Sequence, residues 1–452
     1  MAIEYTNLGF ITLEGFVRRD DVTNRTLKLC FICCGQYGGR QGDEEARLGH
    51  SVFVINTSES DLLDLKAIAK NSDRIIKLEG YGGAAKDIER GQAAIYDNSE
   101  AIVNVLQHED VIDADHVFVV GGMGGGTGNA AIPMICSNLA KIRKPFNGKP
   151  SFGAIITVPA SWEKRGIKKN ALWGLGHLDQ LVKNEDIGAI VLIDNDKLYN
   201  LTQGVHSNTT ETPLNWMDYG NSSLAALLDE ITMLTSLPSS KAFDLDEWRD
   251  VFSSPGWVSI GKSYITNSNE IDRSDKIFRD AFANSPTASD YDYELDTVNG
   301  FMAVIHPKNE IITDSSFKVL EEQFGDFIES AEKPHSGMIA NHIWGKITSK
   351  NKLISEDKKA IVYTAAVSSN LPDRVRRMLV EIEQEEEKLE KKRIERSDKK
   401  SLDLSSFTKQ EDKVVKEKSS LGNQFDLFGS KTEEKEKNNN TFDLKLNFPP
   451  RK

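Results

Sequence analysis

Short, uninterrupted apolar runs alternate with amphipathic stretches through the first half of the chain. Strands that are buried on both faces of a parallel sheet have this continuous pattern. The runs that we predict to be strands are residues 27–34, 51–55, 74–78, 116–120, 152–158 and 188–193. Helical stretches fall between them, for example over most of 88–107 and over 161–183. This order predicts a doubly wound, mostly parallel-sheet α/β domain over residues 27–217, with its ligand at the carboxyl ends of the strands.

A long apolar helix follows this domain. Leucine and isoleucine recur at three- and four-residue steps from Leu224 to Leu234, which predicts a central helix within residues 218–240. Strand-like runs then return over residues 257–261, 300–305, 338–344 and 360–368. They predict a second, α+β domain over residues 241–370.

The last part of the chain is strongly charged. Leu371-Pro372-Asp373 can open a helix, and the charges that follow can form i,i+4 pairs, so we expect a long C-terminal helix over residues 371–397. Residues 398–452 are rich in Lys, Glu, Ser and Asn, which predicts a disordered tail. Residues 1–26 are expected to form a short N-terminal arm.

Composition narrows the class of protein. The chain has 452 residues, which is more than a single hydrophobic core usually holds together, so we expect more than one domain. Its net charge of −13 argues against DNA binding by the body of the protein. No apolar run reaches the length of a membrane span, and the first residues do not resemble a signal peptide. The four cysteines lack the spacing of a zinc site. We therefore expect a cytoplasmic protein without a structural metal site.

The glycine-rich segment Gly121-Gly122-Met123-Gly124-Gly125-Gly126-Thr127-Gly128 carries the candidate chemistry. It lies between a predicted strand and a predicted helix. Glycines allow backbone N–H groups to approach a ligand closely, and a helix N-terminus favours an anion. The segment therefore predicts a phosphate-binding loop, in which Thr127 caps the helix and offers its hydroxyl group.

Three further loops end at the same edge of the predicted sheet. Gly35-Gln36-Tyr37-Gly38-Gly39 follows the first strand, Asn56-Thr57 follows the second, and Glu79 to Asp87 follows the third. Two glycine-rich turns on neighbouring strands could hold one triphosphate from two sides. The first turn lacks the dinucleotide pattern G-x-G-x-x-G with an acidic residue about 20 positions on. A dinucleotide-dependent oxidoreductase is therefore the less favoured alternative.

One motif is discounted. Gly256 to Ser263 matches the string G-x-x-x-x-G-K-S of a P-loop. Its middle, Trp-Val-Ser-Ile, is strand-like, whereas a P-loop needs a strand before it and a helix after it. We therefore predict a strand at this position.

The form Gly-Gly-Gly-Thr-Gly and the order of the loops resemble the tubulin/FtsZ superfamily from about residue 27 to 397. Leu78 to Tyr81, Val191 to Tyr199 and Leu371 to Val375 look like the TubZ family of plasmid-partitioning proteins within it. The sequence departs from the superfamily at Asn129-Ala130, where Ser or Thr followed by Gly is usual. The resemblance implies a GTPase that binds GTP or GDP with Mg²⁺.

The resemblance also implies roles for single residues. Residues 122–128 would form the phosphate loop, residues 35–39 would face the α- and β-phosphates, and Asn56 and Thr57 would lie in the loop after the second strand. Gly82 and Gly83, in the segment that ends at Asp87, would sense the γ-phosphate. The contacts implied for the nucleoside are Glu163 at the ribose, Asn195 at the guanine edge, and Tyr219 and Asn221 at the base. A plain turn residue is the alternative for Asn195.

In that superfamily an acidic loop after the central helix completes the nucleotide site of the next subunit. The matching segment here is residues 242–250. Asp244 is the first choice for the catalytic acid, and Asp246, Glu247 and Asp250 remain alternatives. A carboxylate there could position water in line with the γ-phosphate. These acids could instead cap the helix that follows.

The function that this resemblance implies is a GTP-dependent filament that segregates plasmid or phage DNA and hydrolyses GTP at its head-to-tail interfaces. An FtsZ-type division protein, a phage spindle protein and a non-hydrolysing nucleotide-binding scaffold are the alternatives. The implied partners are other copies of the chain and a DNA-binding adaptor that grips the C-terminal tail. Within the tail, Phe425-Asp426-Leu427 recurs as Phe442-Asp443-Leu444, either as docking motifs or by chance. Neither a membrane nor DNA is expected to bind the body directly.

Overall fold

The computed structural model describes residues 27–68, 72–203, 215–236, 241–307, 312–341 and 360–397. The predicted N-terminal arm, the predicted tail with its repeated triplets, and residues 342–344 of one predicted strand lie outside these ranges. Residues up to Ile382 belong to one compact unit and residues from Glu383 to a second. The domain boundaries predicted within the first unit stay predictions.

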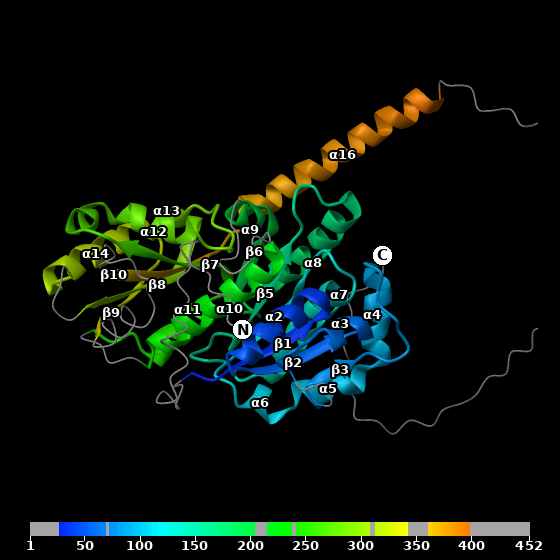
Figure 1. The fold of residues 1–452 in the computed structure, drawn as a ribbon, viewed down its shortest axis with the longest axis horizontal. Helices are drawn as coiled ribbons and strands as arrows, with labels where there is room; N and C mark the ends of the chain where they lie inside the picture. The colour runs from blue at the N-terminus through cyan, green and yellow to red at the C-terminus, as the bar shows by residue number, and fades with distance from the viewer. Residues whose placement is uncertain are drawn as a thin grey trace, which may run out of the picture. The chain divides into compact units, whose positions relative to one another are not determined.

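The described strands form one ten-stranded sheet in the order β3-β2-β1-β4-β5-β6-β7-β10-β8-β9 (Figure 1). The strands are β1 (Leu29–Cys34), β2 (Ser51–Asn56), β3 (Ile75–Lys77), β4 (His116–Gly122), β5 (Phe152–Val158), β6 (Ala189–Asp194), β7 (Gly256–Ile265), β8 (Thr297–Pro307), β9 (His335–Asn341) and β10 (Ala360–Ser368).

The sheet changes character at β7. All pairs from β3 to β7 are parallel, as the continuous apolar runs predicted. Strand β10 then inserts antiparallel between β7 and β8, and β9 pairs parallel with β8. The parallel half brings the carboxyl ends of β1, β2, β4, β5 and β6 to one edge.

Helices connect the strands. In the first half they are α2 (Gly35–Arg47), α3 (Glu59–Leu63), α4 (Ile88–Asp97), α5 (Ser99–Leu106), α6 (Glu109–Ile112), α7 (Thr127–Ile142), α8 (Arg165–Lys183) and α9 (Asn195–Thr202). Then come α10 (Trp216–Leu234), α11 (Leu245–Phe252), a 3-10 helix (Ser268–Arg273), α12 (Ser274–Ala283), α13 (Tyr293–Asp296), α14 (Asp314–Phe327) and α16 (Asp373–Ser397). Among these described helices, none combines the length and apolar composition needed to cross a bilayer.

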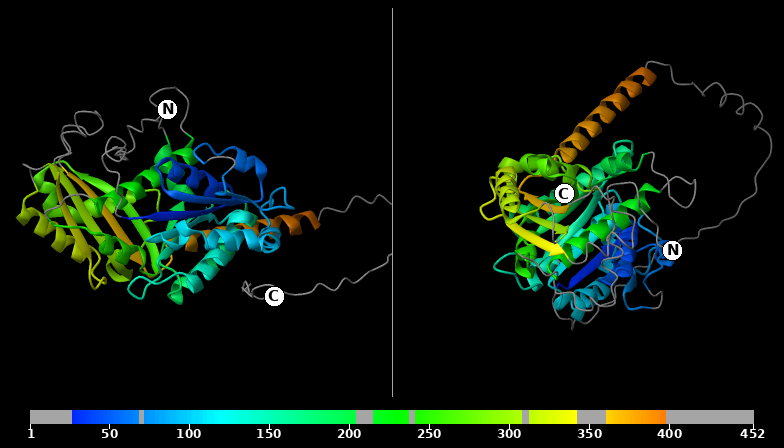
Figure 2. Two further views of the ribbon diagram at one scale, coloured as in Figure 1. Left: turned by 90° about the horizontal axis from the view of Figure 1, so that it is seen from below. Right: turned by 60° about the vertical axis from the view of Figure 1, so that its left-hand side comes forward.

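Helices cover both faces of the parallel half. Helix α2 packs on β2 and β4 and contacts α3 and α10, whereas α7 packs on β4 and β5 and contacts α4 and α8. Figure 2 shows helices on both sides of this half of the sheet. This is the doubly wound α/β arrangement that the sequence predicts.

One hydrophobic cluster runs from the parallel half into the second half of the sheet. It joins β1 residues such as Phe31 to the apolar face of α10 and on to Tyr363 in β10. A second cluster, with Phe278 and Phe324, lies under α12 and α14. Helix α10 is buried along most of its length, so it serves as the central helix.

A buried ion pair ties α10 to the second half of the sheet. The Lys262 ammonium group donates to both carboxylate oxygens of Glu230, at 3.0 and 2.7 Å, and the Tyr363 hydroxyl donates to Oε2 at 3.0 Å. All three side chains are buried. Removing one partner of such a pair leaves an uncompensated charge, so the contact fixes the position of β7 and β10 against α10.

The structure differs from the sequence prediction in detail. The helical prediction over most of residues 88–107 is confirmed, in the form of two helices that meet at Asn98. Residues 161–164 precede α8 instead of belonging to it. Gly256 to Ser263 lies wholly within β7, which confirms that this P-loop string is a strand.

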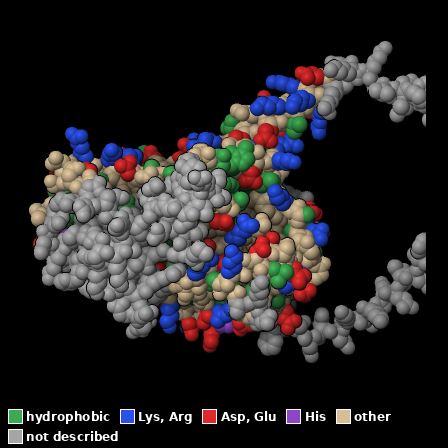
Figure 3. All heavy atoms as spheres, in the orientation of Figure 1, with side chains coloured by type: hydrophobic (Ala, Val, Ile, Leu, Met, Phe, Trp, Pro, Cys, Tyr) green, Lys and Arg blue, Asp and Glu red, His purple; other side chains and the backbone are tan. Residues whose placement is uncertain are grey.

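Helix α16 presents interspersed acidic and basic side chains, seen as red and blue in Figure 3. Most of its described side chains from Glu383 on are exposed, and the ion pair between Arg393 and Glu390 follows the i,i+3 spacing. This agrees with the solvated, charged helix that the sequence predicts.

Candidate nucleotide-binding site

A cavity of about 610 Å³ opens at the carboxyl edge of the parallel strands. All four loops that the sequence singled out contribute to its walls. Among the predicted contact residues, the lining contains Gly35, Gln36, Tyr37, Asn56, Thr57, Gly83, Gly122, Gly124, Gly125, Gly126, Thr127, Gly128, Glu163 and Asn195. The cavity lies where an open α/β sheet binds its ligand.

The phosphate-loop candidate, residues 122–128, begins at the last residue of β4 and ends at the second residue of α7. Gly126, not Thr127, is the cap residue, and it has no side chain that could accept a hydrogen bond from the first turn of α7. The Thr127 hydroxyl instead shares a 2.7 Å hydrogen bond with the Thr57 hydroxyl, where either can donate. The predicted cap is therefore wrong, and Thr127 joins two of the predicted loops because its hydroxyl faces the end of β2.

Close backbone contacts explain several of these glycines. A Cβ atom at Gly126 would lie 2.6 Å from the Asp87 carbonyl oxygen, and one at Gly128 would lie 2.9 Å from that of Cys34. Gly35 has a φ of +72°, a conformation that disfavours other residues. The loops can meet around the cavity only because these positions lack side chains.

The first glycine-rich turn is shorter than expected. Helix α2 begins at Gly35, so only Gly35, Gln36 and Tyr37 reach the cavity. Gly38 is buried within α2, where a Cβ would lie 2.6 Å from the Val120 carbonyl oxygen. Gly38 therefore serves close packing of the helix on the sheet, whereas a Cβ at Gly39 would make only ordinary contacts, the nearest at 3.5 Å. Neither residue lines the cavity.

The loop before α4 holds two unusual backbone conformations. Ala85 and Lys86 have φ values of 50° and 63°, and both line the cavity. Left-handed conformations are costly for residues other than glycine and gather at functional sites. Gly82, in contrast, is exposed and does not contribute to the lining, whereas Gly83 does.

Aromatic side chains form the other end of the cavity. Trp162 and Trp216 line it, and each contacts Tyr199 edge-on, with ring centroids 4.7 and 6.1 Å apart. Asn195, at the start of α9, lines the same end. This end can therefore receive a flat, aromatic group.

The predicted base contacts on α10 turn away from the cavity. Tyr219 is fully buried in the main hydrophobic cluster, and Asn221 is also buried. Neither residue lines the cavity, whereas Trp216 and Met217 from the same turn do. Met123 is buried beneath its loop as well. Tyr219 and Asn221, the two residues that the sequence predicted as base contacts, thus lie on the side of α10 that faces the core.

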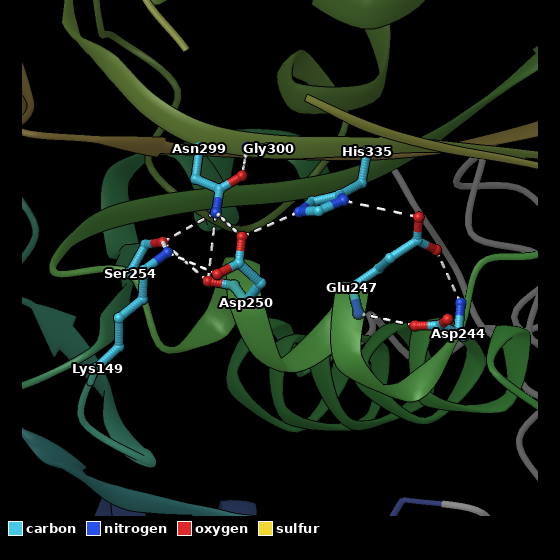
Figure 4. Close-up of polar contacts among 8 residues, drawn as sticks. All are labelled: Lys149, Asp244, Glu247, Asp250, Ser254, Asn299, Gly300 and His335. Carbon is cyan, nitrogen blue, oxygen red and sulfur yellow. Dashed lines mark hydrogen bonds and ion pairs between the residues drawn. The ribbon is translucent and has the colours of Figure 1, made fainter. Parts of the chain in front are cut away.

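The candidate acids lie along α11, from its cap residue Asp244 to Asp250 near its end. Figure 4 shows Asp244, Glu247 and Asp250. Asp244 and Glu247 form a capping box: Asp244 Oδ1 accepts from the Glu247 amide at 3.0 Å, and Glu247 Oε2 accepts from the Asp244 amide at 2.9 Å. The helix-cap alternative is thus correct for this pair. Asp244 and Asp246 are nevertheless exposed, and a cap does not use all the acceptor positions of a carboxylate.

Asp250 is held differently, by three donors. Lys149 Nζ lies 2.7 Å from Oδ1, while Asn299 Nδ2 and His335 Nε2 lie 2.8 and 3.0 Å from Oδ2 (Figure 4). Burial opposes ionisation of this carboxyl, but these hydrogen bonds outweigh it and lower the pKa of Asp250 to about 2. Asp250 therefore acts as a charged anchor between α11 and the strands β8 and β9.

None of the four acids is among the residues that line the cavity. Trp216 lines it at the first residue of α10, and the acids follow the far end of that 19-residue helix. At 1.5 Å per residue the helix is about 28 Å long. One chain therefore carries the cavity and the acids at separate places.

The family model for the Tubulin/FtsZ family, GTPase domain, matches residues 29–203. A second model, for the C-terminal domain of Tubulin/FtsZ-like proteins of the TubZ-like kind, matches residues 230–379. The chain belongs to the tubulin/FtsZ family. The two matches cover the cavity loops and the acidic segment respectively.

Two curated members of the family illustrate the relationship. The tubulin-like protein TubZ of Bacillus cereus is 28% identical over 262 residues, which make up 55% of this chain and 58% of that protein. The cell division protein FtsZ 2 of Methanocaldococcus jannaschii is 26% identical over 324 residues, or 70% of this chain and 75% of that protein. The chain thus spans less than two thirds of the length of the first relative.

Solved structures of this family share the fold. The GTPγS-form protofilament of Bacillus thuringiensis serovar israelensis TubZ superposes with a TM-score of 0.66 at 19% identity, covering 85% of this chain and 98% of that one. A helical model of a two-stranded TubZ filament gives a TM-score of 0.68 at 17% identity, covering 87% and 98%. These likenesses establish the tubulin/FtsZ-like architecture.

Sequence reasoning missed part of the lining. Ser58, Asp61, Thr157, Trp162, Ile167, Trp216 and Met217 line the cavity without having been predicted. Asp61 had a detectable signal, because it follows the predicted loop Asn56-Thr57 by one helical turn. Asn56 and Gln36 both donate to its carboxylate, at 3.2 and 3.4 Å. Trp216 gave no signal, since its role depends on how α10 is rotated.

Proposed function

We propose that this protein is a GTPase that assembles head to tail into filaments of the TubZ kind and segregates plasmid or phage DNA. The observation that carries the proposal is the separation of the glycine-lined cavity from the acidic start of α11 by the length of α10. A nucleotide held in one copy can meet these acids only from a second copy.

The cavity suits a nucleoside triphosphate. Backbone amides of glycine-rich loops and the N-terminus of α7 supply partial positive charge at one end, and aromatic side chains supply a surface for a base at the other. Among the described lining residues, Lys86 is the only Lys or Arg, whereas Asp61 and Glu163 are both acidic. So little positive charge implies that a divalent cation such as Mg²⁺ accompanies the phosphates. That ion would supply charge neutralisation.

The acids suit hydrolysis. An exposed carboxylate at the start of α11 can orient a water molecule toward a γ-phosphate presented by a neighbouring copy. Asp244 is the first candidate and Glu247 and Asp246 are the alternatives, because Asp250 is already engaged by Lys149, Asn299 and His335. Head-to-tail contact is heterologous and builds open filaments.

Partition of DNA rests on the family resemblance. The curated relatives include both TubZ and FtsZ proteins, so an FtsZ-type division filament is the second candidate. The match of residues 230–379 to the TubZ-like C-terminal domain favours the TubZ kind. A DNA-binding adaptor that grips residues 398–452 would link the acidic protein to DNA.

The test is sedimentation and phosphate release with GTP, GDP or ATP and Mg²⁺ across a range of protein concentrations. We expect pelleting with GTP and hydrolysis that begins above a critical concentration. Asp244→Asn keeps a good helix cap but removes the charge. It should still pellet with GTP while its hydrolysis rate falls by about a hundredfold, the scale of one acid–base group.

Asp246→Asn, which changes the alternative acid two residues away, should keep its activity if Asp244 is the catalytic acid. Specific activity that does not depend on protein concentration would contradict hydrolysis between copies. Wild-type turnover in Asp244→Asn would exclude Asp244 and move the role to Glu247 or Asp246.

A further inference from the structure

Arg374, in the first turn of α16, is a buried cation outside the cavity. Its side chain is 1% exposed, although arginine is rarely buried without partners. The neighbouring Arg376 on the same helix is 82% exposed and pairs with Asp373, three residues before it. Arg374 therefore has a specific role in the interior that its neighbour lacks.

Four acceptors surround the Arg374 guanidinium group. Nη2 donates to the Pro159 carbonyl oxygen at 2.6 Å and lies 3.3 Å from Asp196 Oδ2. Nε lies 3.3 Å from Asp194 Oδ1, and Nη1 donates to Glu381 Oε1 at 2.9 Å. The acceptors come from the end of β5, the end of β6, the start of α9 and α16 itself.

These acceptors adjoin the nucleoside end of the cavity. Pro159 lines the cavity itself, and Asp194 and Asp196 flank Asn195, which also lines it. Asp196 in turn accepts from the backbone amide and the hydroxyl of Ser161, at 2.8 and 2.9 Å. Arg374 thus holds both the loop after β5 and the start of α9.

A second buried cation completes the connection. Lys168 Nζ donates to the Ser161 carbonyl oxygen at 2.6 Å and lies 3.1 Å from Glu381 Oε2. Glu381 therefore bridges Arg374 and Lys168. The loop of residues 159–163, which carries Trp162 and Glu163, is fixed from two sides by charges that depend on α16.

We infer that Arg374 is a positioning residue that couples the first turns of α16, residues 373–382, to the nucleoside end of the cavity. The inference rests on the proposed nucleotide binding. Docking of this part of α16 orders the loop 159–163 and Asn195, so it favours nucleotide binding. By thermodynamic reciprocity, bound nucleotide stabilises the docking of residues 373–382 to the same extent.

The first test compares GDP affinity by calorimetry in full-length wild type, Arg374→Met and Arg376→Met. Arg374→Met should raise the Kd for GDP at least about tenfold, within the usual range of coupling, while Arg376→Met should stay within about twofold. In steady-state hydrolysis Arg374→Met should raise KM and leave kcat at saturating GTP nearly unchanged. Loss of folded protein alone would lower kcat without changing KM. Arg374→Lys, which keeps the charge, should restore part of the affinity.

The second test needs no variant. Hydrogen exchange of the wild-type chain, with and without GDP, should show slower exchange of amides 374–382 in the presence of GDP. The amides of α14, which contributes no residue to the Arg374 network, should exchange at the same rate with and without GDP. This measurement remains valid if Arg374→Met does not fold.

The outcomes separate the two proposals. Wild-type protein that does not bind GDP overturns the proposed function, and the inference with it. Wild-type protein that binds GDP, beside a folded Arg374→Met of equal affinity, overturns the inference alone. Exchange of residues 374–382 that ignores bound GDP does the same.

Discussion

At the scale of single residues, Trp216 takes the place that Tyr219 was expected to hold. Tyr219 is fully buried in the core, while Trp216 lines the cavity beside Tyr199 and Trp162. Successive residues of a helix turn by about 100°, so positions 216 and 219 differ by about 60° in direction and by most of a turn along the axis. At the edge of a cavity this difference is enough to place Tyr219 in the core. The sequence showed where α10 begins but not how it is rotated.

Trp216→Ala should weaken GDP binding by about 1–3 kcal/mol, the range for an aromatic side chain under a base. Calorimetry with GDP measures this directly. Tyr219→Phe, which keeps the buried ring, should bind as wild type does. Loss of affinity in Tyr219→Phe with none in Trp216→Ala would restore the original assignment.

Asp250 gives a prediction in pH. Its pKa is lowered from 3.8 to about 2 because the hydrogen bonds from Lys149, His335 and Asn299 outweigh burial. A carboxyl with a depressed pKa stabilises the fold above its unfolded value, and this contribution is lost as the pH falls through the folded value. The stabilisation should therefore be complete at neutral pH and disappear between about pH 4 and pH 2.

Asp250→Asn should lower the free energy of unfolding at pH 7 by about 1–3 kcal/mol, the cost of losing hydrogen bonds to a charged group. Urea unfolding at pH 7, 5, 4 and 3 should show the gap to wild type narrowing below pH 4. The exposed control Asp246→Asn should remain within about 0.5 kcal/mol. A gap that does not depend on pH would mean that the charge of Asp250 is not what stabilises α11.

At the scale of elements, the loops around the cavity are fitted to each other by backbone contact. Gly126 approaches Asp87 and Ala84 of the neighbouring loop, and a Cβ there would lie 2.6 and 2.7 Å from their atoms. Gly125, one residue earlier, has only an ordinary contact at 3.7 Å. A side chain can therefore be added at Gly125 but not at Gly126 without moving the neighbouring loop.

Gly126→Ala should destabilise the protein by about 1–3 kcal/mol, as overpacking does, because the backbone of the loop before α4 has to move. Gly125→Ala should have little effect on stability. Thermal unfolding without nucleotide measures the pair and separates packing from phosphate binding. Equal melting temperatures for the two variants would contradict the close approach of the loops.

The sequence predicted elements well where burial is uniform. Parallel strands covered on both faces produce long apolar runs, so β1, β4, β5 and β6 were visible directly. The break between α4 and α5 was not, since Asn98 is stabilised by tertiary contacts: its side chain donates to the Glu79 carbonyl oxygen and accepts from the Glu79 amide. The network around Arg374 was also invisible, because three of its four partners lie about 180–215 residues away in sequence.

At the scale of the whole molecule, the charged tail is expected to act apart from assembly. The cavity and the acidic start of α11 both lie within residues 27–382. A chain ending at residue 397 should therefore pellet with GTP and hydrolyse it at a rate within about twofold of wild type, since surface changes away from a site usually have small effects.

The same truncation should abolish recruitment of the adaptor and its DNA, measured by co-sedimentation with a cell extract of the host and identification of the proteins retained. Replacing the phenylalanines of the two tail triplets, Phe425 and Phe442, by alanine tests those motifs within the full chain. Unchanged recruitment by the truncated chain would place the adaptor's contact on residues before 398.

The distance between the cavity and the acids has a numerical consequence. If every active site is made by two neighbouring copies, a stack of n copies contains n − 1 complete sites and one cavity that lacks a neighbour's acids. The hydrolysis rate is then proportional to the number of interfaces between copies, not to the number of copies. A pair, with one interface for two copies, therefore has half the activity per copy of a very long stack. In such a stack the copy with the uncompleted cavity keeps its GTP, because no neighbour supplies the acids. One end of the stack therefore carries GTP, while the completed sites convert theirs to GDP.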